Sequence, residues 1–241
     1  MVELLKFERE CFDFPFYKEG MSKDRWLALI IGILVPTLLI FGNFHINGVL
    51  FDLLIFLVPT LAFVYASKGD FSLILRKPVK DDIDLIIVVI ILEFLYTYVI
   101  NTVFKLIFGP NSIAAHAGIS TSINLINNLV PFLSLFGEEL VKFFVFIILF
   151  TVLMKYSKNR KVSIVVATVL MLVYFGLSHI PAYSGKVLQV LLIQGFGSVF
   201  TVFAYLKTKN LFVSYMCHII IDFSSWGLVM LLKALHLMPV V

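Results

Sequence analysis

Two adjacent carboxylates stand inside a stretch that is otherwise apolar enough for hydrocarbon. Glu138 and Glu139 lie within residues 133–151, and Lys142 follows one helical turn later. A charge at bilayer depth costs at least ~2.5 kcal/mol, so ionisable side chains there are functional by default. The alternative is a structural ion pair, because Lys142 lies three residues from one acid and four from the other. One lysine cannot neutralise two carboxylates, so one acid is expected to be protonated or to have another partner.

Three further residues could form a hydrolytic centre with this pair. His179 ends one apolar stretch, and His218 and Asp222 lie four residues apart on one face of the last apolar stretch. A carboxylate among apolar side chains can act as a general base toward water. One histidine could orient that water, and the second could donate to the developing oxyanion. The structural alternatives are a helix-ending His179 and a hydrogen-bonded His218–Asp222 pair.

The composition is that of a membrane protein. The 241 residues are 61% hydrophobic and 14% charged, with a mean hydropathy of +1.03, whereas soluble domains are about 45–50% apolar and about 25% charged. The net charge of +4 reflects basic loops and predicts no nucleic-acid partner. Cys11 and Cys217 fall in a polar segment and a helix, so no disulfide is expected. The polar residues 1–25 exclude a signal peptide and are expected to be a cytoplasmic or interfacial segment.

Hydropathy predicts an all-α, polytopic bundle of transmembrane helices over residues 26–241. About seven spans are expected, at 26–44, 49–66, 83–108, 132–154, 162–179, 187–206 and 211–232. Residues 123–131 are expected to form a short surface or re-entrant piece, and an eighth span follows if 111–131 enters the membrane. Glu93 and Lys105, within the third span, are expected to be structural or to snorkel rather than to join the site.

The basic residues predict the orientation of the bundle. Most of the 19 Lys and Arg residues fall in residues 1–25 and in the loops near 67–82, 155–161 and 207–210. By the positive-inside rule, this bias puts the N-terminus in the cytoplasm and the C-terminus outside. A multi-pass protein of the cell membrane is therefore expected, surrounded by lipid.

The order of the polar residues resembles a known family. The pairs that carry the resemblance are Glu138 with Glu139, Phe175 with His179, and His218 with Asp222. They resemble the motifs EExxxR, FxxxH and HxxxN/D of the CAAX protease and bacteriocin-processing (Abi) family, which are intramembrane glutamic proteases. The resemblance covers residues 125–232. The chain departs from the family at Phe143, which stands at the arginine position, while Lys142 lies one residue earlier on a different face and cannot form a bidentate fork.

The resemblance implies a role for each motif residue. Glu138 would activate water together with His179, and His218 with Asp222 would form the oxyanion side. Asp222 fits there only if it is protonated or orients His218, because an ionised carboxylate would repel an oxyanion. Glu139 would be a supporting acid, paired with Lys142, and Phe175 a supporting residue.

The expected function is therefore an intramembrane endopeptidase that cleaves peptides or membrane-associated proteins. By the resemblance it needs no cofactor, and zinc held by Glu138, His179 and His218 is the less favoured reading. One alternative is a non-catalytic member of the family, such as a bacteriocin immunity protein or scaffold, which the departure at Phe143 favours. Another alternative is a proton-coupled transporter that uses Glu93, Glu138 and Asp222.

Overall fold

The computed structural model describes residues 12–18, 20–42, 44–115 and 125–234. All regular elements in these ranges are helices, which confirms the all-α prediction. Six of the described helical segments are long and apolar enough to cross a membrane, and α8 adds a shorter apolar stretch, Leu211–Ser224. The elements are α1 (Lys23–Phe41), α2 (Gly48–Ser67), η2 (Phe71–Leu73), α3 (Lys80–Phe108), α4 (Leu125–Ser157), α5 (Arg160–Ser178), η3 (Pro181–Tyr183), α6 (Val187–Gln189), η4 (Val190–Gly195), η5 (Phe196–Ser198), α7 (Val199–Thr208) and α8 (Leu211–Ala234).

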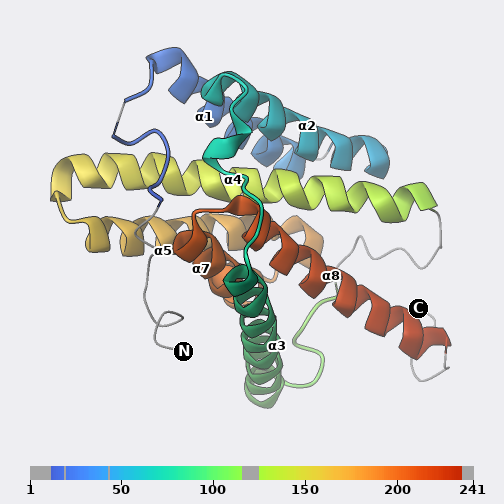
Figure 1. Ribbon diagram of the computed structural model, residues 1–241. Helices are drawn as coiled ribbons and strands as arrows, with labels where there is room; N and C mark the ends of the chain where they lie inside the picture. Colours follow the sequence, from blue (N-terminus) through green and yellow to red (C-terminus); the bar gives the residue numbers. More distant parts are fainter. Residues whose placement is uncertain (1–11, 19, 43, 116–124, 235–241) are drawn as a thin grey trace.

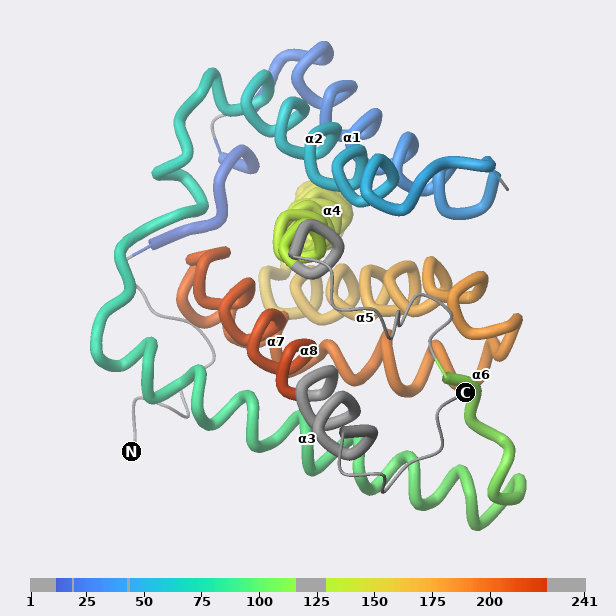
Figure 2. The backbone as a smooth tube through the Cα atoms, turned by 90° about the vertical axis from the view of Figure 1, so that its right-hand side faces the viewer, coloured from blue at the N-terminus to red at the C-terminus, as the bar shows by residue number. Residues whose placement is uncertain are grey.

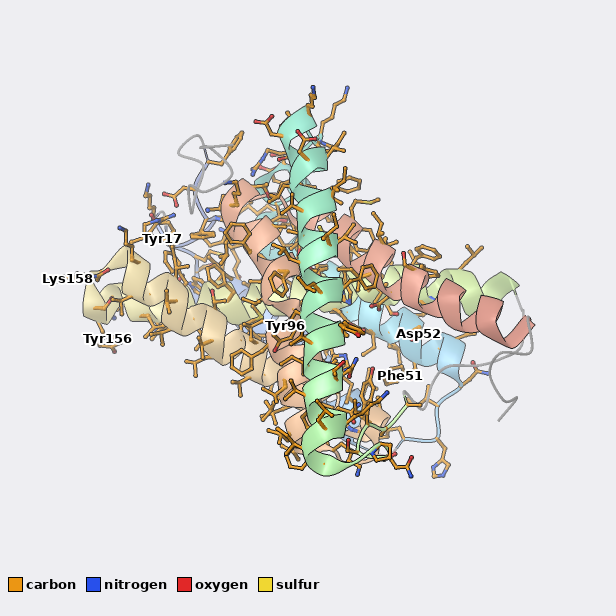
Figure 3. The ribbon with its side chains drawn as sticks, turned by 90° about the horizontal axis from the view of Figure 1, so that it is seen from below. Tyr17, Phe51, Asp52, Tyr96, Tyr156 and Lys158 are labelled. Atoms are coloured by element: carbon orange, nitrogen blue, oxygen red, sulfur yellow. The ribbon has the colours of Figure 1, made fainter. Side chains whose placement is uncertain are left out.

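Helix α4 runs through the centre of the bundle. It lies between a layer formed by α1 and α2 and a layer formed by α5, α7 and α8 (Figure 1), and Figure 2 shows it end-on between them. The main hydrophobic core is centred on α4, which contributes buried phenylalanines to it, among them Phe143, Phe144 and Phe146. Helix α3 lies outermost and crosses α7 and α8, with Tyr96 on the crossing helix (Figure 3). The central helix is therefore the element that also carries the two adjacent acids.

The fourth predicted span is longer than expected. Helix α4 begins at Leu125, so the described part of the separate piece predicted at 123–131 is the first turns of this helix. Pro131 lies inside the helix, where its ring removes one backbone hydrogen bond without ending the helix. The prediction of a separate surface piece from residue 125 onward is thus wrong, and residues 116–124 lie outside the described ranges.

The sixth predicted span is a broken helix. It passes from α6 into the π-helical η4, then into η5 and α7. The irregular part lies where Gly195 meets Gly176 of α5. A Cβ added at Gly195 would come within 2.7 Å of the carbonyl oxygen of Leu172 and 3.1 Å of the Gly176 Cα. The two backbones are in direct contact, as small residues allow.

The described part of the N-terminal segment, residues 12–18, is folded onto the bundle. Phe14 is only 3% exposed and its ring lies 5.0 Å from the rings of both Phe146 and Phe150, measured between centroids. The Lys209 ammonium lies 4.2 Å from the same ring. A segment that merely lies on a surface would not bury an aromatic side chain so fully, so this part of the predicted interfacial segment belongs to the core.

Asp13 connects this segment to the start of α5 through an ion pair with Arg160. Its carboxylate lies 2.9 Å from Arg160 and 2.5 Å from Lys18, and it accepts hydrogen bonds from the Tyr17 hydroxyl and the Phe14 amide. Burial raises the pKa of Asp13, but the bonds from Lys18, Tyr17 and Phe14 and the charge of Arg160 outweigh it and lower the pKa to about 2.

Candidate active site

Glu139 is the centre of a buried polar cluster between α4 and α8. The residue is 1% exposed and forms an ion pair with Lys142. Its Oε1 lies 2.8 Å from Nδ1 of His218, and its Oε2 accepts a 2.6 Å hydrogen bond from the Ser214 hydroxyl. The spacings of three residues on α4 and four on α8 set these side chains on facing sides of their helices. The predicted pairing of Glu139 with Lys142 is confirmed.

The neighbouring Phe143 occupies a different environment. It is 2% exposed, and its ring packs with those of Phe16, Phe63 and Tyr205. The position that carries arginine in the resembled family is therefore part of the aromatic core. Lys142 forms the ion pair with Glu139, and its ammonium also lies 4.5 Å from the centroid of the Phe175 ring.

His218 lies between two carboxylates. Its Nδ1 contacts Glu139, and its Nε2 lies 3.6 Å from the carboxylate of Asp222, one turn further along α8. An ionised Glu139 can only accept, so Nδ1 of His218 is the donor in that bond. The imidazole can therefore donate from Nε2 as well only when it carries both protons. This arrangement suits an oxyanion donor held by Glu139 on one side and Asp222 on the other.

His179 caps the C-terminus of α5. Its Nδ1 lies 2.8 Å from the Phe175 carbonyl oxygen, which can only accept, so this bond fixes the proton on Nδ1 and gives Nε2 an acceptor lone pair. The Phe175 ring lies against both imidazoles, with centroid distances of 4.6 Å to His179 and 6.3 Å to His218. Residues of all three predicted motifs thus meet around Glu139 and Phe175.

Glu138 belongs to the same cluster through its charge. It is partly exposed and interacts electrostatically with His218, Asp222 and Lys142. Its predicted partnership with His179 on one water molecule stays a prediction. A cavity of about 10 Å³, roughly the space of one water molecule, lies on the other side of Glu139 and Lys142, and neither Glu138 nor His179 lines it.

Sequence reasoning missed one residue beside the cluster. Tyr183, in η3, has its ring centroid 6.4 Å from that of His179, bonds Gln194, and interacts electrostatically with Asp222 and Glu138. Burial raises the pKa of Tyr183 to about 12, so its phenol keeps its proton at neutral pH and can donate. The spacing of four residues from His179 is a signal that could have drawn attention to it.

Glu93 of α3, which the transporter alternative names, also lies near the cluster. It was expected to be structural or to snorkel, yet its Oε2 is buried, and the carboxylate interacts electrostatically with His218 and Lys142. The pattern of α3 alone does not reveal these neighbours, because they come from other helices.

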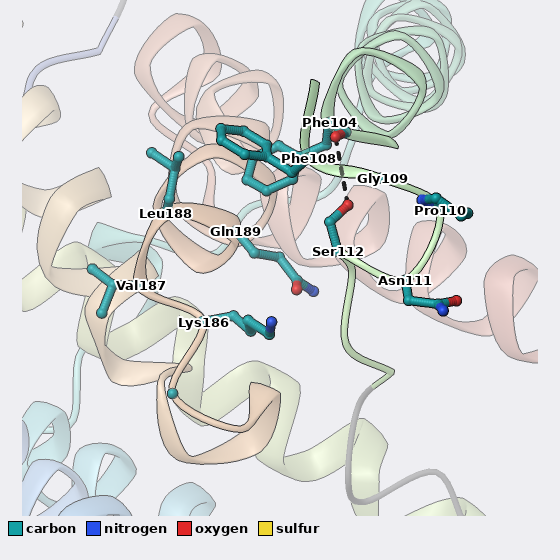
Figure 4. Close-up of a pocket in the computed structure, with 11 residues that line it drawn as sticks. Phe104, Phe108, Gly109, Pro110, Asn111, Ser112, Lys186, Val187, Leu188 and Gln189 are labelled. Atoms are coloured by element: carbon teal, nitrogen blue, oxygen red, sulfur yellow. Dashed lines mark hydrogen bonds between the residues drawn. The ribbon is translucent and has the colours of Figure 1, made fainter. Parts of the chain in front are cut away.

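The described residues contain no group of three His, Cys, Asp or Glu side chains arranged to hold a metal ion. The zinc reading therefore has no geometric support from the described part of the chain. A pocket of about 640 Å³ lies elsewhere, between the end of α3, the 109–112 link and the start of α6 (Figure 4). It is lined mainly by apolar groups, with Lys186 as its charged residue, and none of the acids and histidines discussed above lines it.

Comparison of the chain with protein-family models, curated proteins and solved structures finds no match.

Proposed function

We propose that the protein is an intramembrane peptidase, similar to the CAAX protease and bacteriocin-processing family, that needs no metal. Its substrates would be peptides or membrane-associated proteins. One observation carries the proposal: the Phe175 ring lies against both His179 and His218, while His218 is bonded to Glu139, the residue next to Glu138. Elements from three separate helices thereby contribute an acid, two imidazoles and an ammonium to one place.

The proposed reaction uses these groups in a fixed order. Glu138 takes a proton from a water molecule, which His179 orients through Nε2, as the water oxygen bonds to the scissile carbonyl carbon. The carbonyl oxygen becomes an oxyanion and accepts a hydrogen bond from Nε2 of His218. When the carbon–nitrogen bond breaks, Glu138 passes its proton to the leaving nitrogen. Glu139 keeps Nδ1 of His218 engaged throughout.

The proposed location is the cell membrane, with the N-terminus in the cytoplasm and the C-terminus outside. The basic loops on one side support this orientation. The six described helices that are long and apolar enough to cross a membrane support the multi-pass arrangement.

A second candidate is a non-catalytic protein that binds a partner, such as an immunity protein or scaffold. It is favoured by Phe143, whose ring fills the aromatic core at the position where the resembled family has arginine. The saturated Glu139, with an ion pair and two hydrogen bonds, also fits a purely structural cluster.

The test compares membranes from cells that express wild-type protein, Glu138→Gln, His218→Ala or Asp84→Asn. Mass spectrometry of new protein termini measures cleavage. Loss of a general base typically lowers the rate by about 10²–10⁴, so termini that appear with wild type and Asp84→Asn should vanish with Glu138→Gln and His218→Ala. Asp84 is an exposed acid of α3 and serves as the matched control. Identical termini in all four samples would reject the peptidase and leave the binding protein.

A further inference from the structure

Glu93 lies on the face of α3 that packs against α8. Leu85 and Val89 of α3 share a buried cluster with Val213 and Cys217 of α8, and Glu93 follows Val89 by four residues, on the same stripe. The two helices start close together, because the Leu211 amide bonds the Ile74 carbonyl just ahead of α3. Glu93 thus lies about one turn beyond the residues of α3 that pack on α8, where its carboxylate interacts with the charge of His218.

One oxygen of the Glu93 carboxylate lacks a described hydrogen-bond partner. Its Oε2 is buried and finds no hydrogen-bond partner among the described side chains and backbone. Leaving a buried polar atom unpaired costs free energy, so the position of this oxygen needs an explanation, and a role in the charged cluster beside it is one. Its carboxylate interacts electrostatically with the cluster, most strongly with His218 and then with Lys142 and Asp222.

We propose that Glu93 is a positioning residue of the site, acting through His218. Its negative charge would favour the doubly protonated imidazole, which alone can bond Glu139 through Nδ1 and donate to an oxyanion through Nε2. The role in catalysis rests on the proposed peptidase function, but the effect on the charge of His218 does not. Glu93 touches neither the water nor the scissile bond in this scheme.

Several other ionisable groups belong to the surroundings of His218 and are unchanged in the test. They are Glu138, Glu139 and Lys142 on α4, His179 on α5, Tyr183 on η3, and Cys217 and Asp222 on α8. Glu93→Gln removes one negative charge from this set while keeping the side-chain shape. A nearby charge shifts a titration by about one to three pH units, and we expect the lower end of that range here.

The first measurement is an NMR titration of His218 in the purified, detergent-solubilised full chain with labelled histidine. Glu93→Gln is expected to lower the midpoint for protonation of His218 by about one pH unit, and Glu93→Asp should retain most of the wild-type value. Asp84→Asn, an acid-to-amide change nine residues away on the opposite face of α3, should leave the midpoint unchanged. Equal midpoints in wild type and Glu93→Gln, or equal shifts in both amide variants, would overturn the proposal.

The second measurement is hydrolysis of a quenched-fluorescent peptide library by the same variants in proteoliposomes. The alkaline limb of the kcat profile should move by the same amount toward lower pH in Glu93→Gln, which is about tenfold less activity at the pH of that limb. KM should be unchanged, since Glu93 does not contact the peptide. An unmoved limb overturns the catalytic role. Wild-type protein that cleaves nothing overturns the peptidase and this role with it, while the NMR titration still decides whether Glu93 controls His218.

Discussion

The buried pair of Glu139 and Lys142 gives the sharpest prediction about stability. Both side chains are almost fully enclosed, with 2% and 3% of their surface exposed. Glu139→Gln leaves the Lys142 ammonium in the core without its ionic partner, beside a neutral amide and the face of the Phe175 ring and with only the more distant charges of Glu138 and Glu93 to offset it. Breaking a buried ion pair from one side costs about 3–5 kcal/mol, because an uncompensated charge stays behind. In a chain of this size, that loss lowers Tm by roughly 6–20 °C.

Lys142→Met should cost less than Glu139→Gln. The carboxylate of Glu139 keeps its bonds to Ser214 and to Nδ1 of His218 when the ammonium is removed. The double variant removes both charges, so it should be more stable than Glu139→Gln alone by about 2 kcal/mol.

The assay for this cycle is thermal unfolding of detergent-solubilised protein. Size-exclusion chromatography after heating to each temperature measures the folded fraction, and the Tm of each variant is read from that curve. Asp84→Asn, an exposed acid, should stay within about 0.5 kcal/mol of wild type. If the losses of the two single variants simply add in the double variant, the two charges do not stabilise each other and the reasoning is refuted.

Three further predictions concern packing and pH. Gly137→Ala should prevent folding, because an added Cβ would fall on the carbonyl of Ile55 in α2, whereas Gly48→Ala meets open space and should be tolerated; expression of monodisperse protein measures both. Phe14→Ala should lower stability by about 3–5 kcal/mol, measured as a loss of Tm, because it empties a buried aromatic site. The lowered pKa of Asp13 means that its contribution to stability is present above its ordinary value of 3.8 and is lost as pH falls toward about 2. The Tm of Asp13→Asn should therefore lie below that of wild type at pH 6 and approach it near pH 2, and a constant difference across that range would contradict the assignment.

Local features of the chain could be predicted from sequence because they depend on neighbours along one helix. Hydropathy predicted where most of the helices lie, and the spacing of Glu139 and Lys142 predicted their ion pair. The proximity of His218 to Asp222 followed in the same way from i, i+4 geometry. These contacts are set by helical periodicity, which is a property of the sequence itself.

Other features depend on how helices cross, and periodicity carries no information about that. The sequence does not show which charges Glu93 meets, because these depend on how α3 packs against α8. The break in the sixth helix follows from the backbone contact between Gly176 and Gly195, which lie on different elements. The burial of Phe14 likewise depends on aromatic rings from α4 and α7, so the polar N-terminal segment was expected at the interface.

The contact between Gly176 and Gly195 also limits how a substrate could reach the site. The outer edge of the cluster is already accessible, since 46% of the Asp222 side chain is exposed, whereas Glu139 behind it is enclosed. At the glycine contact there is no side chain whose rotamer could change to make room. We therefore expect α5 and η4 to move together, with Phe175 and His179 keeping their places relative to η4. If the bundle opens for the proposed peptide substrate, it should open at α3 or α8, whose shared seam is lined by apolar side chains rather than by touching backbones.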